Sequence, residues 1–241
     1  PNYEAVTEKV PVTVQKAALT VKANDQSITY GGSIQTGVGQ VTAAPVNGDT
    51  LTAVTVSAAA ANAGTYTDGI TATGAKIGNN GTDVTANYEI SYGAGDLTIS
   101  PLTITVTPDS GQSKEYGADD PVLTYTVTPA LIGDDKLTGA LTYEGADTGA
   151  TGQHKITLGN LSAGENYTLA LSGDVMFEIT KLSLATAVVT LDNASFTYDG
   201  TAKTPAVTVK KGNSTVDPGE YDISYSNSNG GAGDNIHAGT V

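Results

Sequence analysis

The sequence holds few residues of the types and spacing that enzyme catalysis requires. Its two histidines are His154 and His237, and it contains no cysteine. A catalytic histidine needs an orienting carboxylate and a nucleophile within reach, and a histidine-based zinc site needs further nitrogen or carboxylate ligands. The lack of cysteine also excludes disulfides, thiol chemistry and cysteine zinc sites. We therefore expect both histidines to be exposed strand residues.

Two glycine-rich stretches could be mistaken for nucleotide-binding loops. They are Gly93-Ala94-Gly95 and Gly231-Ala232-Gly233, and a dinucleotide-binding fingerprint would need a further glycine where Thr98 and Ile236 stand. Neither stretch precedes an expected helix. We therefore predict turns at both places and no cofactor-binding residues.

Two pairs of adjacent acids, Asp119-Asp120 and Asp134-Asp135, could bind calcium, which prefers about six to eight oxygen ligands. No Asp-x-Asp-x-Asp-Gly loop is present, and aspartate is a common turn residue, so we favour turns and keep calcium as the alternative. As glycosidase carboxylates these acids would need a walled sugar cleft, and the chain has no tryptophan to line one. The sequence therefore predicts no catalytic residues and no metal ligands.

Six tyrosines stand at recurring positions and could be read as a glycan-binding ladder. Recurrence at equivalent positions favours a core role instead, in which the ring is buried and the hydroxyl bonds a nearby backbone group. These residues are Tyr3, Tyr30, Tyr88, Tyr116, Tyr167 and Tyr198.

Three lysines, Lys203, Lys210 and Lys211, lie near asparagines in the sequence. They raise the alternative of Lys–Asn isopeptide bonds. No pairing can be read from the sequence, so we expect no such bond.

The charge balance excludes several classes of partner. The formal net charge is −14 and the isoelectric point about 4.2, so phosphate repulsion opposes binding to nucleic acid and to anionic membranes. No stretch approaches the roughly 20 apolar residues of a membrane span. The first ten residues, PNYEAVTEKV, lack the pattern of a signal peptide, and we expect the chain to come from within a longer protein.

Internal repeats decide the architecture. An Asn-Tyr pair followed by a short strand occurs three times, and we interpret it as a closing hairpin with a Gly/Asp turn. The pairs are Asn2-Tyr3, Asn87-Tyr88 and Asn166-Tyr167. Two further marks recur in the same order, a Tyr followed by Gly or Asp-Gly and a Gly-Asp loop. They are Tyr30-Gly31, Tyr116-Gly117 and Tyr198-Asp199-Gly200, with Asn47-Gly48-Asp49 and Ile132-Gly133-Asp134-Asp135.

These marks divide the chain into 1–15, the closing hairpin of a preceding repeat, then repeats at 16–101, 102–181 and 182–241. The third repeat stops before its closing hairpin. Either the ends of the 241-residue sequence fall without regard to the repeat boundaries, which we favour, or residues 1–15 complete the sheet of a neighbouring copy. We call 16–101, 102–181 and 182–241 the first, second and third repeats.

The apolar pattern has a period of two, as in Leu19-Thr20-Val21 and Leu123-Thr124-Tyr125. Turn signals recur about every eight to twelve residues, and the one helix candidate, Ser57–Ala61, is too short for more than a turn. We therefore predict an all-β fold, a tandem array of small β-sandwich or β-grasp-like (immunoglobulin-like) domains.

The marks resemble the MBG and YDG repeat families of bacterial surface proteins. The resemblance covers nearly the whole chain. It rests on Tyr30-Gly31, Asn47-Gly48-Asp49-Thr50-Leu51, Gly64-Thr65-Tyr66 and Asn87-Tyr88 in the first repeat, and on Tyr116-Gly117, Asp120-Pro121 and Asn166-Tyr167 in the second. In the third repeat, Phe196–Pro205 is similar to the YDG variant.

The resemblance implies a non-catalytic, extracellular segment of a bacterial surface adhesin, a stalk or spacer. It brings no catalytic residues to transfer. The alternative is a module that binds a glycan or a host surface protein. Partners would then be a glycan or surface protein, not nucleic acid or membrane, and we expect this fragment to be monomeric within a longer multidomain chain.

Overall fold

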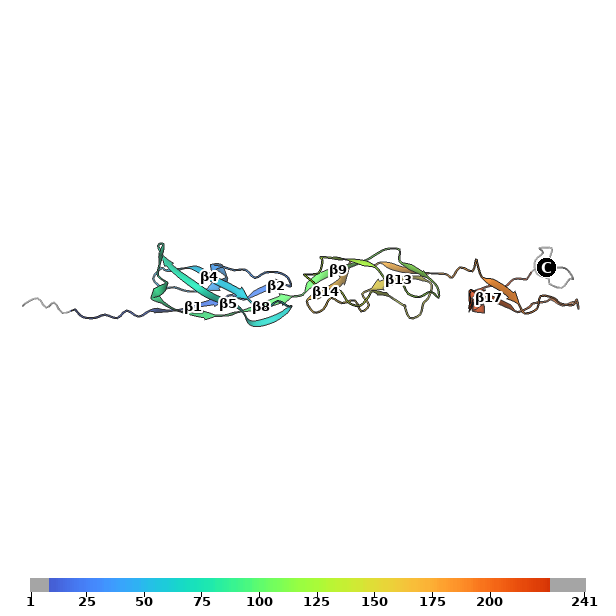
Figure 1. Ribbon diagram of the computed structural model, residues 1–241, viewed down its shortest axis with the longest axis horizontal. Helices are drawn as coiled ribbons and strands as arrows, with labels where there is room; N and C mark the ends of the chain where they lie inside the picture. The colour runs from blue at the N-terminus through green and yellow to red at the C-terminus, as the bar shows by residue number, and fades with distance from the viewer. Residues whose placement is uncertain (1–8, 226–241) are drawn as a thin grey trace, which may run out of the picture. The chain divides into compact units, whose positions relative to one another are not determined.

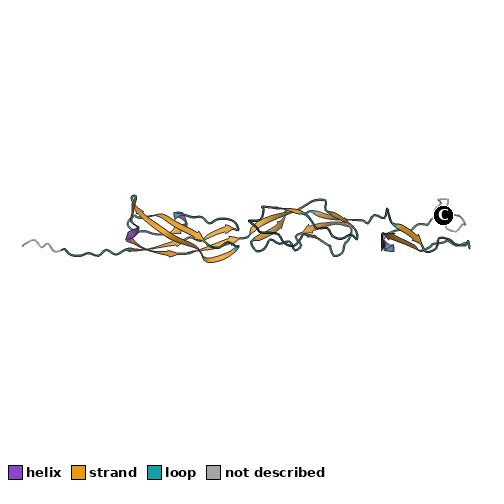
Figure 2. Ribbon diagram, in the orientation of Figure 1, coloured by secondary structure: helices purple, strands orange, loops and turns teal. Residues whose placement is uncertain are grey.

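The computed structural model describes residues 9–225, and the elements in this range are strands with three short 3-10 helices (Figure 2). The predicted all-β class is confirmed, with 45% strand and no described helix of seven or more residues. None of the described helices is long and apolar enough to span a membrane. The described residues divide into two compact units. The first comprises residues up to Gln112, Pro121–Asp147 and Gln153–Phe177, and the second comprises Ser113–Asp120, Thr148–Gly152 and residues from Glu178 onward.

The first repeat is a sandwich of two sheets (Figure 1). One sheet has the order β3-β1-β7, and the other has the order β2-β8-β5-β4 with β6 paired to β5. The strands are β1 (Ala17–Ala23), β2 (Gln26–Thr29), β3 (Val41–Thr42), β4 (Thr50–Ala58), β5 (Gly64–Asn79), β6 (Thr82–Asp83), β7 (Tyr88–Gly93) and β8 (Gly95–Ser100), with 3-10 helices η1 (Val38–Gln40) and η2 (Thr85–Asn87).

The period-two pattern places the core. Along β1, Leu19, Val21 and Ala23 are buried, while the intervening Thr20 and Lys22 are exposed. Such alternation puts one face of a strand against the core and the other in solvent. Buried side chains from both sheets form one cluster: Leu19, Val21, Ala23, Val56, Ile70, Ala72, Ala75, Ile77, Tyr88, Leu97 and Ile99.

The second repeat uses the same arrangement of its first and last strands. β9 lies between β11 and β14, and a second sheet has the order β10-β15-β13-β12. Phe177 and Tyr143 stack in its core with ring centroids 4.3 Å apart. The strands are β9 (Leu102–Pro108), β10 (Ser113–Glu115), β11 (Tyr125–Thr128), β12 (Thr142–Tyr143), β13 (Gly152–Thr157), β14 (Tyr167–Leu171) and β15 (Met176–Thr180).

The described part of the third repeat is one small sheet of order β16-β17-β18. Its strands are β16 (Val188–Leu191), β17 (Val207–Lys211) and β18 (Ser214–Thr215), followed by the 3-10 helix η3 (Pro218–Glu220). The antiparallel pairing of β16 with β17 corresponds to that of β9 with β11.

The closing-hairpin interpretation is wrong for Asn87-Tyr88 and Asn166-Tyr167. The two strands after each pair do not bond to each other. Instead β7 pairs parallel with β1, from Ala17 opposite Tyr88, and β8 pairs parallel with β2. In the second repeat, β14 pairs parallel with β9, and β15 pairs parallel with β10. The segment after Asn2-Tyr3 begins outside the described residues.

The physical reason is that the β7–β8 segment does not turn back on itself. It crosses from one sheet to the other beside the β1–β2 segment, which crosses in the same way. β1 passes to β2 through Asn24-Asp25, and β7 passes to β8 through Ala94. Asp25 Oδ1 accepts a hydrogen bond from the Asp96 N–H at 2.8 Å, which fixes one crossing against the other. A β-carbon on Gly95 would lie 2.6 Å from the Asn24 carbonyl oxygen, so only glycine allows this approach.

We predict that Gly95→Ala destabilises the first repeat by about 1–3 kcal/mol, because the new methyl meets backbone atoms that cannot rotate away. Thermal unfolding followed by far-UV circular dichroism measures the change. Gly39→Ala is the matched control, since nothing lies within 4 Å of an added β-carbon there. Equal stability of the two variants would contradict the crossing contact.

Candidate functional site

Polar side chains of the first and second repeats meet within the first compact unit. Asp135 Oδ2 accepts hydrogen bonds from the hydroxyls of Tyr30, at 2.9 Å, and Tyr167, at 2.6 Å. The two tyrosine rings lie edge to face, with centroids 5.3 Å apart. We call this cluster the joint; it comprises Tyr30, Gly31, Asn62 and Ala63 of the first repeat with Ile132, Asp135, Asn166 and Tyr167 of the second.

The Tyr-Gly motif positions the contribution of the first repeat. Tyr30 follows the end of β2, and its N–H donates to the Ser100 carbonyl at 2.8 Å, beside the start of the second repeat. Gly31 has φ of 79°, which favours glycine, and a β-carbon there would also lie 2.1 Å from Ile132 Cδ1. Glycine therefore turns the chain and makes room for the isoleucine of the next repeat.

The Gly-Asp loop positions the carboxylate of the second repeat. Gly133 has φ of 58°, and the Asp135 N–H donates to the Ile132 carbonyl at 3.2 Å, which closes a tight turn. The Ile132 N–H donates to the Tyr167 hydroxyl oxygen at 2.8 Å. That hydroxyl accepts one hydrogen bond and donates its own proton to Asp135, so its polar capacity is used inside the structure.

Asn166 forms the other half of the joint. Its side-chain oxygen accepts from the Ala63 N–H at 2.8 Å, and its side-chain nitrogen donates to Asn62 Oδ1 at 3.1 Å. Its backbone carbonyl accepts from the Leu102 N–H at 2.9 Å, at the start of β9. The two residues of one Asn-Tyr motif thus bind the preceding repeat at two separate points.

The first repeat contains the same tyrosine–aspartate contact in its own loop. The Tyr88 hydroxyl donates to Asp49 Oδ2 at 2.7 Å and accepts from the Val46 N–H at 3.1 Å. The other oxygen of Asp49 accepts from the side chain of Asn79. The contact therefore occurs in both the first and the second repeat, and Asp135 adds to it a tyrosine from the neighbouring repeat.

The hydrogen bonds of the joint favour a charged Asp135 carboxylate and neutral tyrosine hydroxyls. The Tyr167 and Tyr30 hydroxyls, in that order, lower the pKa of Asp135, because they stabilise its charged form. Burial, then the hydrogen bond to Asp135, raises the pKa of Tyr167. For Tyr30 the hydrogen bond to Asp135 is the larger cause of a raised pKa, followed by burial.

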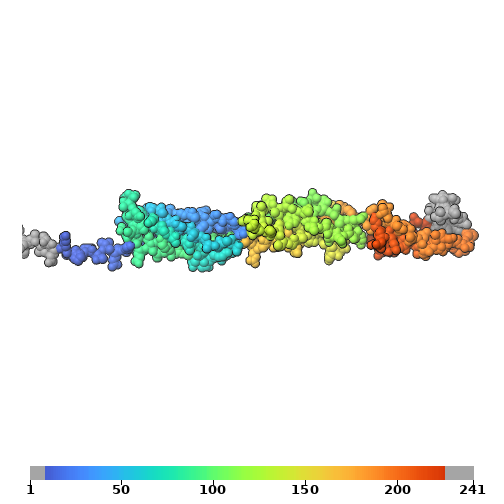
Figure 3. Space-filling view, in the orientation of Figure 1, coloured from blue at the N-terminus to red at the C-terminus, as the bar shows by residue number. Residues whose placement is uncertain are grey.

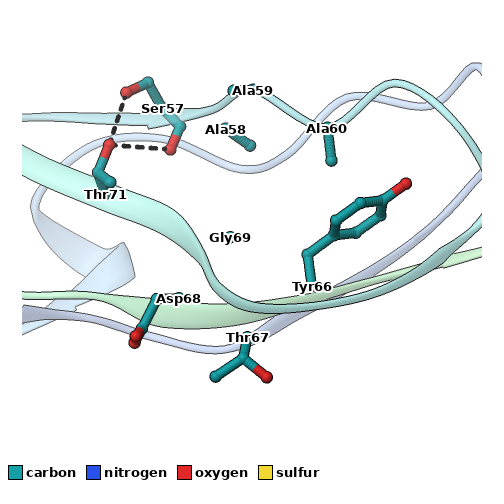
Figure 4. Close-up of a pocket in the computed structure, with 9 residues that line it drawn as sticks. All are labelled: Ser57, Ala58, Ala59, Ala60, Tyr66, Thr67, Asp68, Gly69 and Thr71. Atoms are coloured by element: carbon teal, nitrogen blue, oxygen red, sulfur yellow. Dashed lines mark hydrogen bonds between the residues drawn. The ribbon is translucent and has the colours of Figure 1, made fainter.

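A surface hollow of about 460 Å³ lies on the first repeat between the end of β4 and the start of β5 (Figure 4). Its lining consists of the alanines at 58–60, the ring of Tyr66, Gly69 and the polar residues Ser57, Thr67, Asp68 and Thr71. The Ser57 and Thr71 hydroxyls bond each other at 3.0 Å, and the picture shows Asp68 pointing away from the alanine segment 58–60. The hollow does not bring together the converging polar groups that an active site needs.

The predicted core role of the tyrosines is confirmed at Tyr88 and Tyr167. Both are at most 7% exposed and accept a hydrogen bond from a backbone N–H. The prediction is wrong for Tyr116 and Tyr198, which are 43% and 61% exposed, and Tyr30 is half-buried in the joint. Tyr3 lies outside the described residues.

The candidate polar residues otherwise take up local structural contacts. His154 is half-buried in β13 with its ring against Tyr143, and Asp120 forms an ion pair with Lys114 at 2.5 Å. Lys203 binds Asp199, and Lys211 donates to the Thr186 hydroxyl at 2.8 Å. His237 and the glycines at 231–233 lie outside the described range.

Between residues 9 and 225, no group of three or more His, Asp or Glu is placed to hold a metal ion. The sequence interpretation missed that Asp135 is shared between two repeats and that Asn166 bonds the preceding one. The recurrence of aspartate at Asp49 and Asp135, and of asparagine before Tyr88 and Tyr167, was the available signal.

Comparison with known families gave a match over both described sandwiches. The model of the MBG domain (YGX type) matches residues 19–98 and again 104–177, which together exceed half of the chain. No curated protein and no solved structure is similar enough to give a match.

We predict that Tyr167→Phe lowers the melting temperature of the second repeat by roughly 4–8 °C, because the Ile132 N–H loses its acceptor and Asp135 loses one of its two tyrosine donors. Differential scanning calorimetry measures the shift. Tyr116→Phe, at an exposed tyrosine, serves as the control and should leave the transition unchanged. A similar shift in both variants would contradict the role of the Tyr167 hydroxyl.

The joint should also give stability a defined pH dependence. Because Asp135 has a lowered pKa in the folded chain, its contribution is present above the unfolded carboxyl pKa, about 3.9, and is lost as pH falls through the folded value. The stability difference between the native chain and Asp135→Asn should therefore shrink between about pH 5 and pH 2. Denaturant unfolding at several pH values measures it.

The control for this titration is Asp134→Asn, which removes the same charge one residue earlier. The raised pKa values of Tyr30 and Tyr167 set the upper end of the pH range in which the joint stabilises the fold. Their contribution is present below the unfolded tyrosine pKa, about 10, and is lost as pH rises through the folded values. A pH profile shared by the Asp134 and Asp135 variants would refute the assignment.

Proposed function

Because the chain belongs to the MBG domain family of the YGX type, we propose that it is a non-catalytic spacer in the extracellular stalk of a bacterial surface adhesin. MBG domains occur in surface proteins and are generally non-enzymatic repeat modules. The joint is the observation that supports the spacer role. A spacer transmits position and force, and for this its successive repeats must be coupled rather than independently mobile.

Three features at the boundary between the first and second repeats support such coupling. Only Pro101 separates β8 of the first repeat from β9 of the second. Proline fixes its own φ and restricts the residue before it, so the connection is short and stiff. The Asp135 and Asn166 side chains then bond the preceding repeat at two further points.

The chemistry of the surface supports the same role. The first repeat offers a hollow with few free polar groups, and the net charge of −14 keeps a long chain hydrated and disfavours anionic partners. The outward face of β9, with Thr103, Thr105 and Thr107, adds hydroxyls to the surface. These properties suit a segment whose task is to hold another domain away from a cell surface.

The test is a binding screen of the purified 241-residue chain against mucins, matrix proteins and glycans, with and without calcium. The spacer role predicts no saturable binding to any of them. Saturable binding to one ligand, lost in Tyr116→Ala or Tyr198→Ala at the exposed tyrosines, would replace the spacer with a ligand-binding module. Binding that requires calcium would also overturn the proposal.

A further inference from the structure

The first and last segments of the first repeat pair with each other along their whole length. β1 pairs parallel with β7 at six successive positions, and β2 pairs parallel with β8 at four. In both sheets each residue lies opposite the residue 71 positions later, as in the hydrogen bond of 3.0 Å between the Thr20 and Ser91 hydroxyls. Figure 3 shows the dark-blue chain before β1 meeting the green atoms of the last segment. We call these four strands the terminal ribbon of the repeat.

The second repeat has a terminal ribbon of the same kind. β9 pairs parallel with β14 at five positions, and β10 pairs parallel with β15 at three, again with one constant offset. Backbone hydrogen bonds continue the pairing past the strand ends. The Ser172 N–H donates to the Val106 carbonyl at 2.9 Å, and the Tyr116 N–H donates to the Thr180 carbonyl at 2.8 Å. Only Pro101 separates the two ribbons, between β8 and β9.

The direction of the strands decides how a repeat responds to a pull on the chain. The chain enters the terminal ribbon at the first residue of β1 and leaves it at the last residue of β8. Tension therefore draws the two paired segments in opposite directions along their own length. Parallel strands loaded in this way must slide past each other, so their evenly spaced hydrogen bonds share the load. A pull on the same end of both strands would instead break these bonds one after another.

Burial and a side-chain contact strengthen the terminal ribbon against sliding. Val21 of β1 and Leu97 of β8 are 0% exposed, so sliding must move their side chains through a packed core. Where both segments cross between the sheets, the Asp96 N–H donates to Asp25 Oδ1 at 2.8 Å. The two segments are thus held to each other in both sheets and at the crossing.

We propose that each of the first two repeats is a shear clamp, a load-bearing unit in which tension passes from the first segment directly into the last through the terminal ribbon. In the first repeat this path bypasses residues 30–87, which include the surface hollow and the turn at Asn80-Gly81. Their length is released only after the ribbon separates.

The shear clamp rests on the proposed spacer role for its biological purpose, and its test is independent of the binding screen. A ligand found in that screen would overturn the spacer role and leave the clamp in place. A failed pulling experiment would overturn the clamp and leave the spacer role in place.

Single-molecule pulling in two directions tests the clamp, because the native chain has no cysteine and handles can be attached at chosen positions. In the full 241-residue chain, Lys16→Cys with Ser100→Cys loads the terminal ribbon in shear. Lys16→Cys with Asn87→Cys loads β1 and β7 at the same end and opens their pairing stepwise. All three native side chains are exposed, so the variants keep the fold.

We expect the shear pair to unfold at a several-fold higher force than the stepwise pair at the same loading rate. Both variants have the same fold, and resistance to pulling depends on the unfolding barrier rather than on equilibrium stability. Equal unfolding forces in the two directions would overturn the proposal.

A loop insertion tests the bypassed segment. A short glycine-serine insert between Asn80 and Gly81, which are both exposed, is added to the shear pair. The unfolding force should stay the same, and the length released afterwards should grow by roughly 3.5 Å for each added residue. Release of the added length before the main unfolding step would show that the load runs through residues 30–87, and would contradict the clamp.

Discussion

Parallel pairing between the first and last strands of each repeat is the interaction on which the rest of the fold depends. In the first repeat it joins β1 to β7 and β2 to β8, strands separated by most of the repeat's sequence. Each pair belongs to a different sheet, so the last segment holds both halves of the sandwich together. The entropic cost of closing such a long loop must be recovered by the core that forms between the sheets. A repeat is therefore complete only when its Asn-Tyr segment is in place.

The joint follows from this arrangement. Tyr167 and Asn166 stand at the start of the last segment of the second repeat, next to Leu102, where the chain arrives from the first repeat. When the last segment of the second repeat is in place, these side chains therefore lie against the first repeat. The hydroxyl of Tyr30 reaches Asp135, whose pKa is lowered by the two tyrosine hydrogen bonds. One motif thus serves both the internal stability of a repeat and its connection to its neighbour.

The sequence was sufficient for the fold class and for the burial of Tyr88 and Tyr167, because period-two alternation and repetition are local signals. The pairing of the Asn-Tyr strands could not be read in the same way. Two adjacent strands with a Gly/Asp turn have the local pattern of a hairpin. The long-range pairing of β7 with β1 and of β8 with β2 shows that they cross between sheets, and no local pattern contains it. The sharing of Asp135 depends on the position of a second repeat, which no single-repeat pattern contains.

The central claim is that Asp135 couples the first repeat to the second through Tyr30, and a double-mutant cycle tests it most directly. Unfolding free energies are measured for the native chain, Tyr30→Phe, Asp135→Asn and the double variant, under conditions where the second repeat unfolds. The account predicts that the double variant loses less stability than the sum of the single losses, since both remove the same hydrogen bond. Additive losses would contradict it and leave the repeats energetically independent at this contact.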